Sequence, residues 1–253
     1  MTSWEDISSW LATDKPIETA YASGDLLVYF PEVHKLFGIP QPEEHHPEID
    51  CGIHIILVLE QAKKLSSDPG VWFAALCHDL GKGLTPIDNY PKHINHERLG
   101  KEPLEEIILK YQIPSDIAQL ALKSCTEHLR AHKSLEMRPG NIIQWFMDND
   151  WYNNHSEFEK FLIVSESDAL GRKGKSLDLY VQRYFLKDFY EASKDMIDNI
   201  VDVDLKTRED ILGCIIPPLK KIYGDSNNGL HRKEYISDKY RLCLNKLPEN
   251  YCG

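Results

Sequence analysis

The sequence places histidine and aspartate residues at the ends of apolar segments. His54 stands at the start of one such segment, His78 and Asp79 are adjacent at the end of the next, and Asp168 lies three residues before Gly171. A carboxylate in apolar surroundings is unfavourable unless something cationic compensates its charge. Two imidazoles and two carboxylates, with no thiolate, suit Mn, Fe, Ni, Co or Mg better than a structural zinc. These four side chains are therefore predicted to bind a divalent metal.

A site of four ligands leaves coordination positions open for water and a phosphate oxygen. A catalytic metal needs such positions, because it must lower the pKa of a bound water and polarise the substrate. Each residue alone has an ordinary alternative: a single histidine on an apolar helix is more often a core residue, and a His-Asp dipeptide occurs by chance. The order of the residues, each at the end of a predicted helix, favours a metal site.

The elements that position these residues are predicted to be helices throughout. Apolar residues recur at helical spacing over residues 53–65 and 71–80, and Gly81 ends the second segment. The prolines and the Asp-Asn pair within residues 83–95 predict a loop. Asn95 is predicted to cap a helix that runs to Tyr111. Further helices are predicted from Ser115, near residues 139–146, from Ser156 to Gly171, after Ser176, from Thr207 with a kink or break at Pro217-Pro218, and over residues 233–247.

This pattern predicts an all-α fold class, a helical bundle with a helical C-terminal extension. The chain contains no internal repeat and no linker rich in Gly, Ser or Pro. We expect an N-terminal lead-in over residues 1–41, a core over residues 42–175, and an extension over residues 176–253 that packs on the core.

The composition is that of an ordinary globular protein with excess negative charge. The 253 residues include 29 Lys and Arg and 40 Asp and Glu, so the formal net charge is −11. This charge argues against broad nucleic-acid or membrane-surface binding, which needs a positive face. The six cysteines lack zinc-finger spacing, and no apolar run reaches the roughly 18 to 20 residues of a membrane span. With no signal peptide at the start, we expect a cytoplasmic protein with reduced thiols.

Several motifs add a resemblance to a known family. The order of His54, His78-Asp79 and Asp168 resembles the HD superfamily of metal-dependent phosphohydrolases. The likeness is closer to one member, the C-terminal HD domain of bacterial CCA-adding tRNA nucleotidyltransferases of the multifunctional type. It covers about residues 25–190 and is carried by FPE at 30–32, LFGIPQP at 36–42, HHPEID at 45–50, GIH at 52–54, LCHDLGKGLTP at 76–86, SESD at 165–168 and GR at 171–172.

The resemblance implies an all-helical fold with 2′,3′-cyclic phosphodiesterase, 2′-nucleotidase or phosphatase activity. Its metal ligands would be His54, His78, Asp79 and Asp168, with Ni, Mn, Co or Mg as the metal. Asp79 would bridge the metal and a metal-bound water that attacks phosphorus. We favour a site with one metal ion over a site with two.

Other residues resemble further parts of such sites. His96 and His128 resemble ligands of a second metal in dinuclear members, and Lys82, with either histidine, would stabilise developing negative charge. Lys82 could pair with substrate phosphate, or it could be a solvated lysine at a helix end. Arg172 is a weaker candidate for phosphate binding. His132 lies four residues after His128, on the same helical face, and is a further candidate for substrate binding. His45 and His46, in a proline-flanked loop, could line the mouth of the pocket.

The sequence also departs from the multifunctional enzymes. About fifty residues precede His54, without a Gly-Ser plus Asp-x-Asp polymerase signature, so we expect no CCA addition and favour a free-standing protein over one domain of a longer one. The expected partner is a small phosphorylated substrate, a nucleotide or an RNA 3′ end; tRNA binding is doubtful, and a homodimer stays open. The alternatives are a nucleotidase specific for mononucleotides and a non-catalytic RNA- or protein-binding module with a structural metal.

Overall fold

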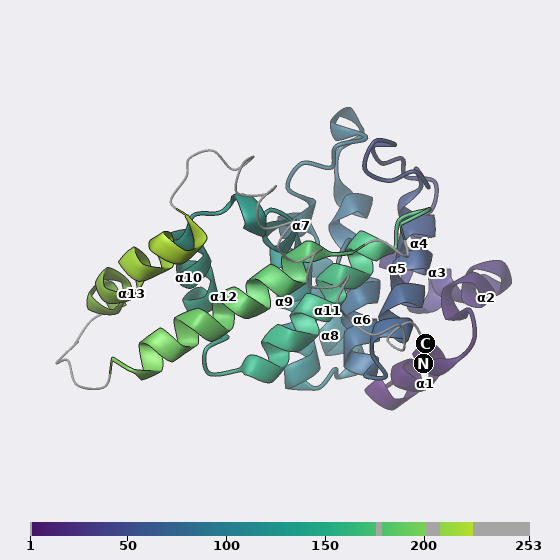
Figure 1. The fold of residues 1–253 in the computed structure, drawn as a ribbon. Coiled ribbons are helices and arrows are strands. Elements are labelled where there is room, and N and C mark those ends of the chain that lie inside the picture. Colours follow the sequence, from purple (N-terminus) through teal and green to yellow (C-terminus); the bar gives the residue numbers. More distant parts are fainter. Residues whose placement is uncertain (1, 176–178, 201–207, 225–253) are drawn as a thin grey trace, which may run out of the picture. The chain divides into compact units, whose positions relative to one another are not determined.

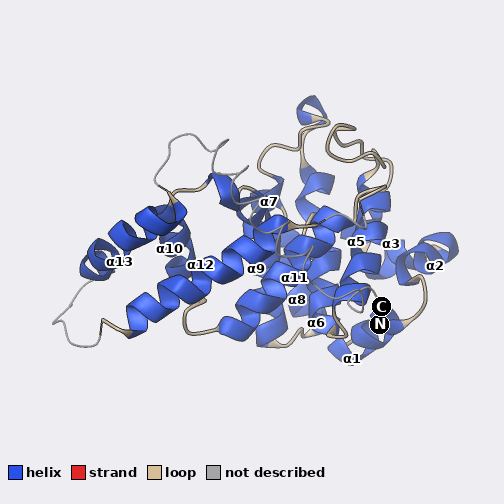
Figure 2. Ribbon diagram, in the orientation of Figure 1, coloured by secondary structure: helices blue, strands red, loops and turns tan. Residues whose placement is uncertain are grey.

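The computed structural model describes residues 2–175, 179–200 and 208–224, and every regular element in these ranges is a helix (Figures 1 and 2). The all-α prediction is therefore confirmed. In these ranges the strand-like pairing is an isolated antiparallel bridge between Pro40 and Asp50. The predicted helix over residues 233–247 lies outside the described residues. None of the described helices is both long enough and apolar enough to cross a membrane.

The chain divides into two compact units. The first comprises Met1–Leu129 and Ser156–Asp178, and the second comprises Arg130–His155 and Leu179–Gly253. The sequence-based segment boundaries at residues 41 and 175 stay a prediction. The first unit contains α1 (Trp4–Ala12), α2 (Pro16–Ser23), α3 (Asp25–Tyr29), α4 (Pro31–His34), α5 (Cys51–Leu65), α6 (Pro69–Cys77), the 3₁₀ helices η1 (Leu80–Leu84) and η2 (Ile87–Asn89), α7 (His96–Leu99), α8 (Lys101–Tyr111), most of α9 (Ser115–His132), and α11 (His155–Leu170) after its first residue.

Helices α5 and α6 form the centre of the first unit, and their ends are set by local sequence. The Asp50 side chain accepts a hydrogen bond from the backbone N of Ile53 and caps α5, while Asp68 caps α6 by accepting from Gly70. Pro69 occupies the first position of α6, where its missing N–H is harmless. Helix α6 packs against both α5 and α1 and is apolar around its circumference, so it is almost wholly buried.

Two glycines allow backbone segments to approach closely. A Cβ atom at Gly171, just after α11, would lie 2.6 Å from Cγ2 of Val58 and 2.7 Å from its Cα in α5. A Cβ atom at Gly81, in η1, would overlap the backbone carbonyl oxygen of His96 in α7. These contacts bring the end of α11 against α5 and α7 against η1.

The predicted helix from Asn95 to Tyr111 is divided in the structure. Helix α7 ends at Leu99 and α8 begins at Lys101. Pro103 has no N–H to donate to the carbonyl of Leu99, as a continuous helix would require. Gly100, between the two helices, lies against Gly81 and the Cys125 thiol, where a side chain would not fit. Asn95 was expected to cap this helix with its side chain, but it has a φ of 64° and makes no such bond.

The second unit contains η3 (Ser134–Glu136), α10 (Pro139–Asp148), α12 (Val181–Asp198) and α13 (Arg208–Tyr223). Its interior is aromatic and includes Trp145, Phe146, Trp151 and Phe189. Helix α13 was predicted to kink or break at Pro217-Pro218, and the structure carries it through both prolines without a break. The carbonyls that lose their helical partners belong to Gly213 and Cys214, which are exposed, so water can satisfy them.

Candidate metal centre

A first group of potential metal ligands joins three separate helical segments. His54 comes from the first turn of α5, His78 from the end of α6, and Asp168 from the last turn of α11. Nε2 of His54 lies 3.0 Å from Oδ1 of Asp168, and Nε2 of His78 lies 3.7 Å from the same oxygen. All three residues are buried, and their ligand atoms lie within 4.8 Å of one another.

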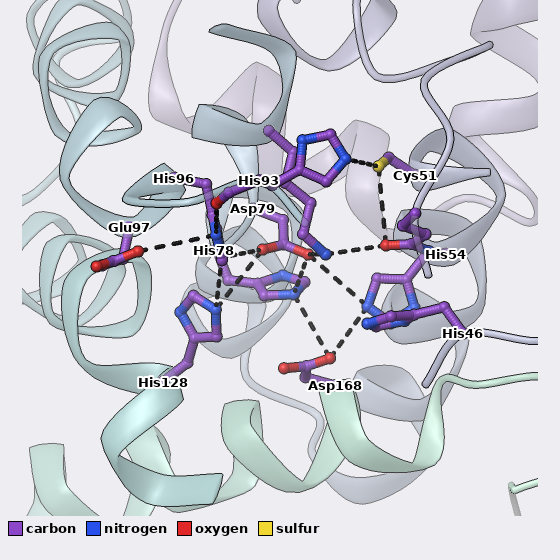
Figure 3. Close-up of polar contacts among 12 residues, drawn as sticks. His46, Cys51, His54, His78, Asp79, His93, His96, Glu97, His128 and Asp168 are labelled. Atoms are coloured by element: carbon purple, nitrogen blue, oxygen red, sulfur yellow. Dashed lines mark hydrogen bonds and ion pairs between the residues drawn. The ribbon is translucent and has the colours of Figure 1, made fainter. Parts of the chain in front are cut away.

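A second group lies next to the first and is formed by Asp79, His96 and His128. Oδ1 of Asp79 is 3.2 Å from Nε2 of His96 and 3.6 Å from Nε2 of His128, and the two imidazole nitrogens are 3.3 Å apart. The other carboxylate oxygen of Asp79, Oδ2, is 3.2 Å from Nε2 of His78 and 3.8 Å from Nε2 of His54. Asp79 thus lies between the two groups, with one oxygen toward each (Figure 3).

Backbone carbonyls fix the orientation of three of these imidazoles. Nδ1 of His78 is 2.8 Å from the carbonyl oxygen of Ala75, Nδ1 of His96 is 2.9 Å from that of His93, and Nδ1 of His128 is 3.0 Å from that of Ser124. In a neutral imidazole, an Nδ1–H that donates to a carbonyl leaves the lone pair on Nε2. The three rings therefore present Nε2, the atom that can bind a metal, toward the aspartates.

The electrostatics of the cluster fit a cation. Nε2 of His78 and Oδ1 of Asp79 are buried and have no aligned hydrogen-bond partner among the described residues, although each lies near charged atoms. Burial lowers the pKa of His78, but the charges of Asp79 and Asp168 outweigh it and raise the pKa to about 10. Burial dominates at His128 and lowers its pKa to about 3. The cluster favours positive charge, and His128 is a neutral imidazole at pH 7.

Lys82 supplies positive charge directly to the cluster. Its side chain is only 7% exposed, and Nζ lies 2.7 Å from Oδ2 of Asp79 and 2.9 Å from Oε1 of Gln41. Burial lowers the pKa of Lys82, but the carboxylate of Asp79 outweighs it and raises the pKa. Lys82 and His78 in turn hold the pKa of Asp79 well below its usual range against the effect of burial. The interpretation of Lys82 as a solvated lysine is therefore wrong.

The other sequence-based candidates lie outside these two groups, although His46 forms a third group of potential metal ligands with Glu48 and His54. Arg172 is half-buried four residues after Asp168, and its Nε has no hydrogen-bond partner among the described residues. His132 belongs to the second unit, where its Nδ1 lies 2.9 Å from the hydroxyl of Tyr180. His45 is exposed, whereas His46 packs edge-on against the His54 ring with centroids 4.6 Å apart.

Sequence reasoning did not single out Gln41 and Glu48. Gln41 is buried, accepts a hydrogen bond from Lys82, and donates to Oε1 of Glu48 at 3.2 Å. Oε1 of Glu48 also lies 2.9 Å from Nδ1 of His54. Burial raises the pKa of Glu48, but its contacts with His46 and His54 outweigh it and hold the pKa well below the usual range. Both residues lie in a loop without periodicity. The signals available were the LFGIPQP and HHPEID motifs that contain them, and a carboxylate six residues before a metal-ligand candidate.

Comparison with known proteins agrees with this arrangement. Residues 52–188, more than half of the chain, match the HD domain family. The chain belongs to the HD-domain family. This family is generally one of metal-dependent hydrolases that bind divalent metals, and the His and Asp groups described above are suited to such a metal.

Curated relatives of this HD-domain chain are named Multifunctional CCA protein. One from Pseudomonas fluorescens (strain SBW25) is 39% identical over 197 residues, covering 77% of this chain and 48% of the relative. One from Pseudomonas syringae pv. syringae (strain B728a) is 36% identical over 211 residues, covering 82% and 52%. One from Actinobacillus pleuropneumoniae serotype 5b (strain L20) is 39% identical over 197 residues, covering 75% and 48%. The chain therefore spans about half the length of these relatives, and the predicted resemblance is confirmed.

Proposed function

We propose that this chain is a metal-dependent phosphohydrolase that cleaves phosphomonoesters or 2′,3′-cyclic phosphodiesters of nucleotides or RNA ends, with water as the nucleophile. The observation that carries the proposal is the Asp79 carboxylate, whose two oxygens face two different sets of imidazoles. Membership in the HD-domain family supports metal-dependent hydrolysis. The name of the relatives, Multifunctional CCA protein, supports a nucleotide or an RNA 3′ end as the substrate class.

We propose two cations rather than the single one favoured by the sequence, because two of the ligand groups, His54-His78-Asp168 and Asp79-His96-His128, meet at the two oxygens of the Asp79 carboxylate. A divalent cation held there supplies Lewis-acid chemistry, since it polarises a phosphate oxygen and lowers the pKa of water. Imidazole and carboxylate ligands suit Ni, Mn, Co or Mg. The first set would be His54, His78, Asp168 and Oδ2 of Asp79; the second would be Oδ1 of Asp79, His96 and His128.

The remaining residues supply charge, bind the metal or contact the substrate. The ammonium of Lys82 holds Asp79 ionised and adds positive charge where a phosphoryl group gains negative charge during hydrolysis. The low pKa of His128 favours a ligand over a general acid, because a neutral imidazole binds metal and a proton donor must be protonated. For Arg172, a contact with substrate phosphate stays a prediction. For His132, hydrogen-bonded to Tyr180, a substrate contact stays a prediction.

The proposal is tested by phosphate release from 2′,3′-cyclic AMP, 2′-AMP and an aryl phosphate after metal stripping and re-addition of Ni, Mn, Co or Mg. Asp79→Asn keeps the shape of the side chain but removes the charge that both groups share, so we expect at least a hundredfold loss of turnover. The matched control is Asp88→Asn, at an exposed aspartate in η2. Both variants should retain the helical circular dichroism of the unaltered chain.

Three results would separate the candidate functions. Turnover of cyclic and 2′-phosphates that is lost in Asp79→Asn supports the proposal. Turnover confined to 5′- or 3′-mononucleotides favours the nucleotidase alternative. Metal that binds tightly without turnover of any substrate refutes the hydrolase and favours a binding module with a structural metal.

A further inference from the structure

The loop between α4 and α5 is a closed structure that delivers two polar side chains to the metal centre. The bridge between Pro40 and Asp50 joins its ends, and the backbone N of Gln41 donates to the carbonyl oxygen of Ile49 at 2.7 Å. The carboxylate of Asp50 caps α5 and also accepts from the backbone N of Gly38 at 2.7 Å. The position of Glu48 relative to α5 and His54 is therefore fixed by several backbone hydrogen bonds.

Glu48 collects contacts from both sides of this loop. Its side chain is 1% exposed. Oε1 lies 2.9 Å from Nδ1 of His54 and 3.2 Å from Nδ1 of His46, and it accepts from Nε2 of Gln41 at 3.2 Å. Oε2 accepts from the backbone N of Lys173 at 3.1 Å, in the segment that follows α11. A buried carboxylate with this many partners is held in one orientation.

His54 differs from the other three imidazoles of the cluster. Nδ1 of each of those three rings lies against a backbone carbonyl, whereas Nδ1 of His54 lies against the carboxylate of Glu48. Nε2 of His54 cannot both carry a proton and bind a cation, so binding requires the proton to reside on Nδ1. The pair is not in linear hydrogen-bond alignment, but the χ2 torsion of histidine is broad, so a small ring rotation aligns it at little cost.

We propose that Glu48 is a positioning residue for the metal centre: its carboxylate accepts the Nδ1 proton of His54 and thereby presents Nε2 of that ring to the cation. This inference rests on the proposed function. Outer partners of metal-bound histidines change metal affinity by roughly 10- to 100-fold when removed. The Gln41 amide joins Lys82 to Glu48, so this loop holds both His54 and the lysine beside Asp79.

A purely structural role for Glu48 would predict a different result. If the carboxylate only anchored the loop through His46 and Lys173, its loss would lower the stability of the fold. The metal affinity of the folded protein would then stay unchanged. Affinity, tautomer and stability must therefore be measured on the same variants.

The experiment is a Co²⁺ titration of the full chain, followed by the visible absorption of bound Co²⁺. His54→Ala identifies the binding phase to which His54 contributes. We expect Glu48→Ala to weaken that phase by roughly 10- to 100-fold, and Glu48→Gln, which keeps an oxygen acceptor without the charge, to weaken it less. Glu44→Gln is the matched control, because Glu44 is an exposed residue of the same loop and should leave the phase unchanged.

Nuclear magnetic resonance of the imidazole nitrogens gives an independent readout. In the Co²⁺-free chain loaded with diamagnetic Zn²⁺, we expect the Nδ1–H tautomer of His54, and Glu48→Ala should reduce its population. Thermal unfolding checks that both Glu48 variants fold, and Glu48→Gln keeps the side-chain volume if Glu48→Ala does not fold.

The outcomes distinguish this inference from the proposed function. The positioning role is overturned if the folded Glu48 variants have a Co²⁺ affinity within twofold of that of the unaltered chain and keep its His54 tautomer. In that case, hydrolysis by the unaltered chain leaves the proposed function intact. If the unaltered chain shows no Co²⁺ binding phase that depends on His54, both the positioning role and the proposed function are overturned. Weaker binding in both Glu48 variants, with Glu44→Gln unchanged, supports the inference.

Discussion

The contact between Gly171 and α5 gives a quantitative test of how the first ligand group is built. A Cβ atom at position 171 would lie 2.7 Å from both Cα and N of Val58, whereas an ordinary contact begins near 3.4 Å. Because these are backbone atoms, no side-chain rotation relieves the overlap, and Gly171→Ala must separate the end of α11 from α5 by about 0.7 Å. Val58 is one helical turn after His54, and Asp168 lies three residues before Gly171.

Two consequences follow for Gly171→Ala. Overpacking of a buried contact costs about 1–3 kcal/mol, so the free energy of unfolding should fall by that amount. Metal–ligand distances tolerate only about 0.2 Å. A displacement of Asp168 relative to His54, now 3.0 Å apart, should therefore weaken the His54-dependent Co²⁺ phase. The second ligand group, which does not include Asp168, should keep its affinity.

The measurements are denaturant unfolding and Co²⁺ titration of the same variant. Gly213→Ala is the control, because a Cβ atom at this exposed position of α13 meets nothing within 4 Å and its φ is not positive. That variant should be neutral or more stable, by up to about 1 kcal/mol, since alanine is the better helix former. The reasoning would be refuted if Gly171→Ala had a free energy of unfolding within about 0.3 kcal/mol of that of the unaltered chain and an unchanged Co²⁺ affinity.

Three further predictions concern other parts of the first unit. Gly81→Ala should displace α7 and weaken the Co²⁺ phase that depends on His96 more than the His54-dependent phase; equal loss in both phases would contradict this. Because the pKa of His78 is raised to about 10, cation binding displaces a proton from its ring. The apparent Co²⁺ affinity should therefore rise by up to about tenfold per pH unit between pH 6.5 and 8.5. A Co²⁺ affinity that does not change over this pH range would argue against it. Burial raises the pKa of the Cys125 thiol from 9.0 to about 12, so this thiol ionises at lower pH in the unfolded chain than in the folded one. The free energy of unfolding should therefore fall as the pH rises from 9 toward 12, by at most roughly 1.4 kcal/mol per pH unit. Cys125→Ala should reduce this slope.

Much of the fold could be predicted from the sequence because the helices carry local signals. The apolar pattern from residue 53 to 65 corresponds to α5, which begins at Cys51 and ends at Leu65. The segment predicted over residues 71–80 corresponds to α6, but α6 ends earlier, at Cys77, and Gly81 lies inside η1. The close packing of Gly100 against Gly81 could not be predicted, because it joins residues nineteen positions apart in sequence. Helix α13 continues through two prolines because the carbonyls that lose their helical hydrogen bonds are exposed to water, and this exposure depends on the packing of the helix.

The candidate site shows the same division between local and distant causes. The types and order of His54, His78, Asp79 and Asp168 are visible in the sequence, and the structure brings them together. The position of Asp79 between two ligand groups is not visible, because it depends on how α5, α7, α9 and α11 meet around one carboxylate. Glu48 lies in a loop whose shape is set by a bridge between its ends rather than by periodicity.

The wide separation of the ligands along the chain affects when a cation could first be held during synthesis. His54 and Asp168 are 114 residues apart, and α11 is the last helix of the first unit to leave the ribosome. A nascent chain that ends before α11 lacks Asp168 and so cannot complete the first group, although the residues of the second group, Asp79, His96 and His128, are already present. Cation uptake by the first group would then coincide with completion of the unit's core and would stabilise only chains that had already folded.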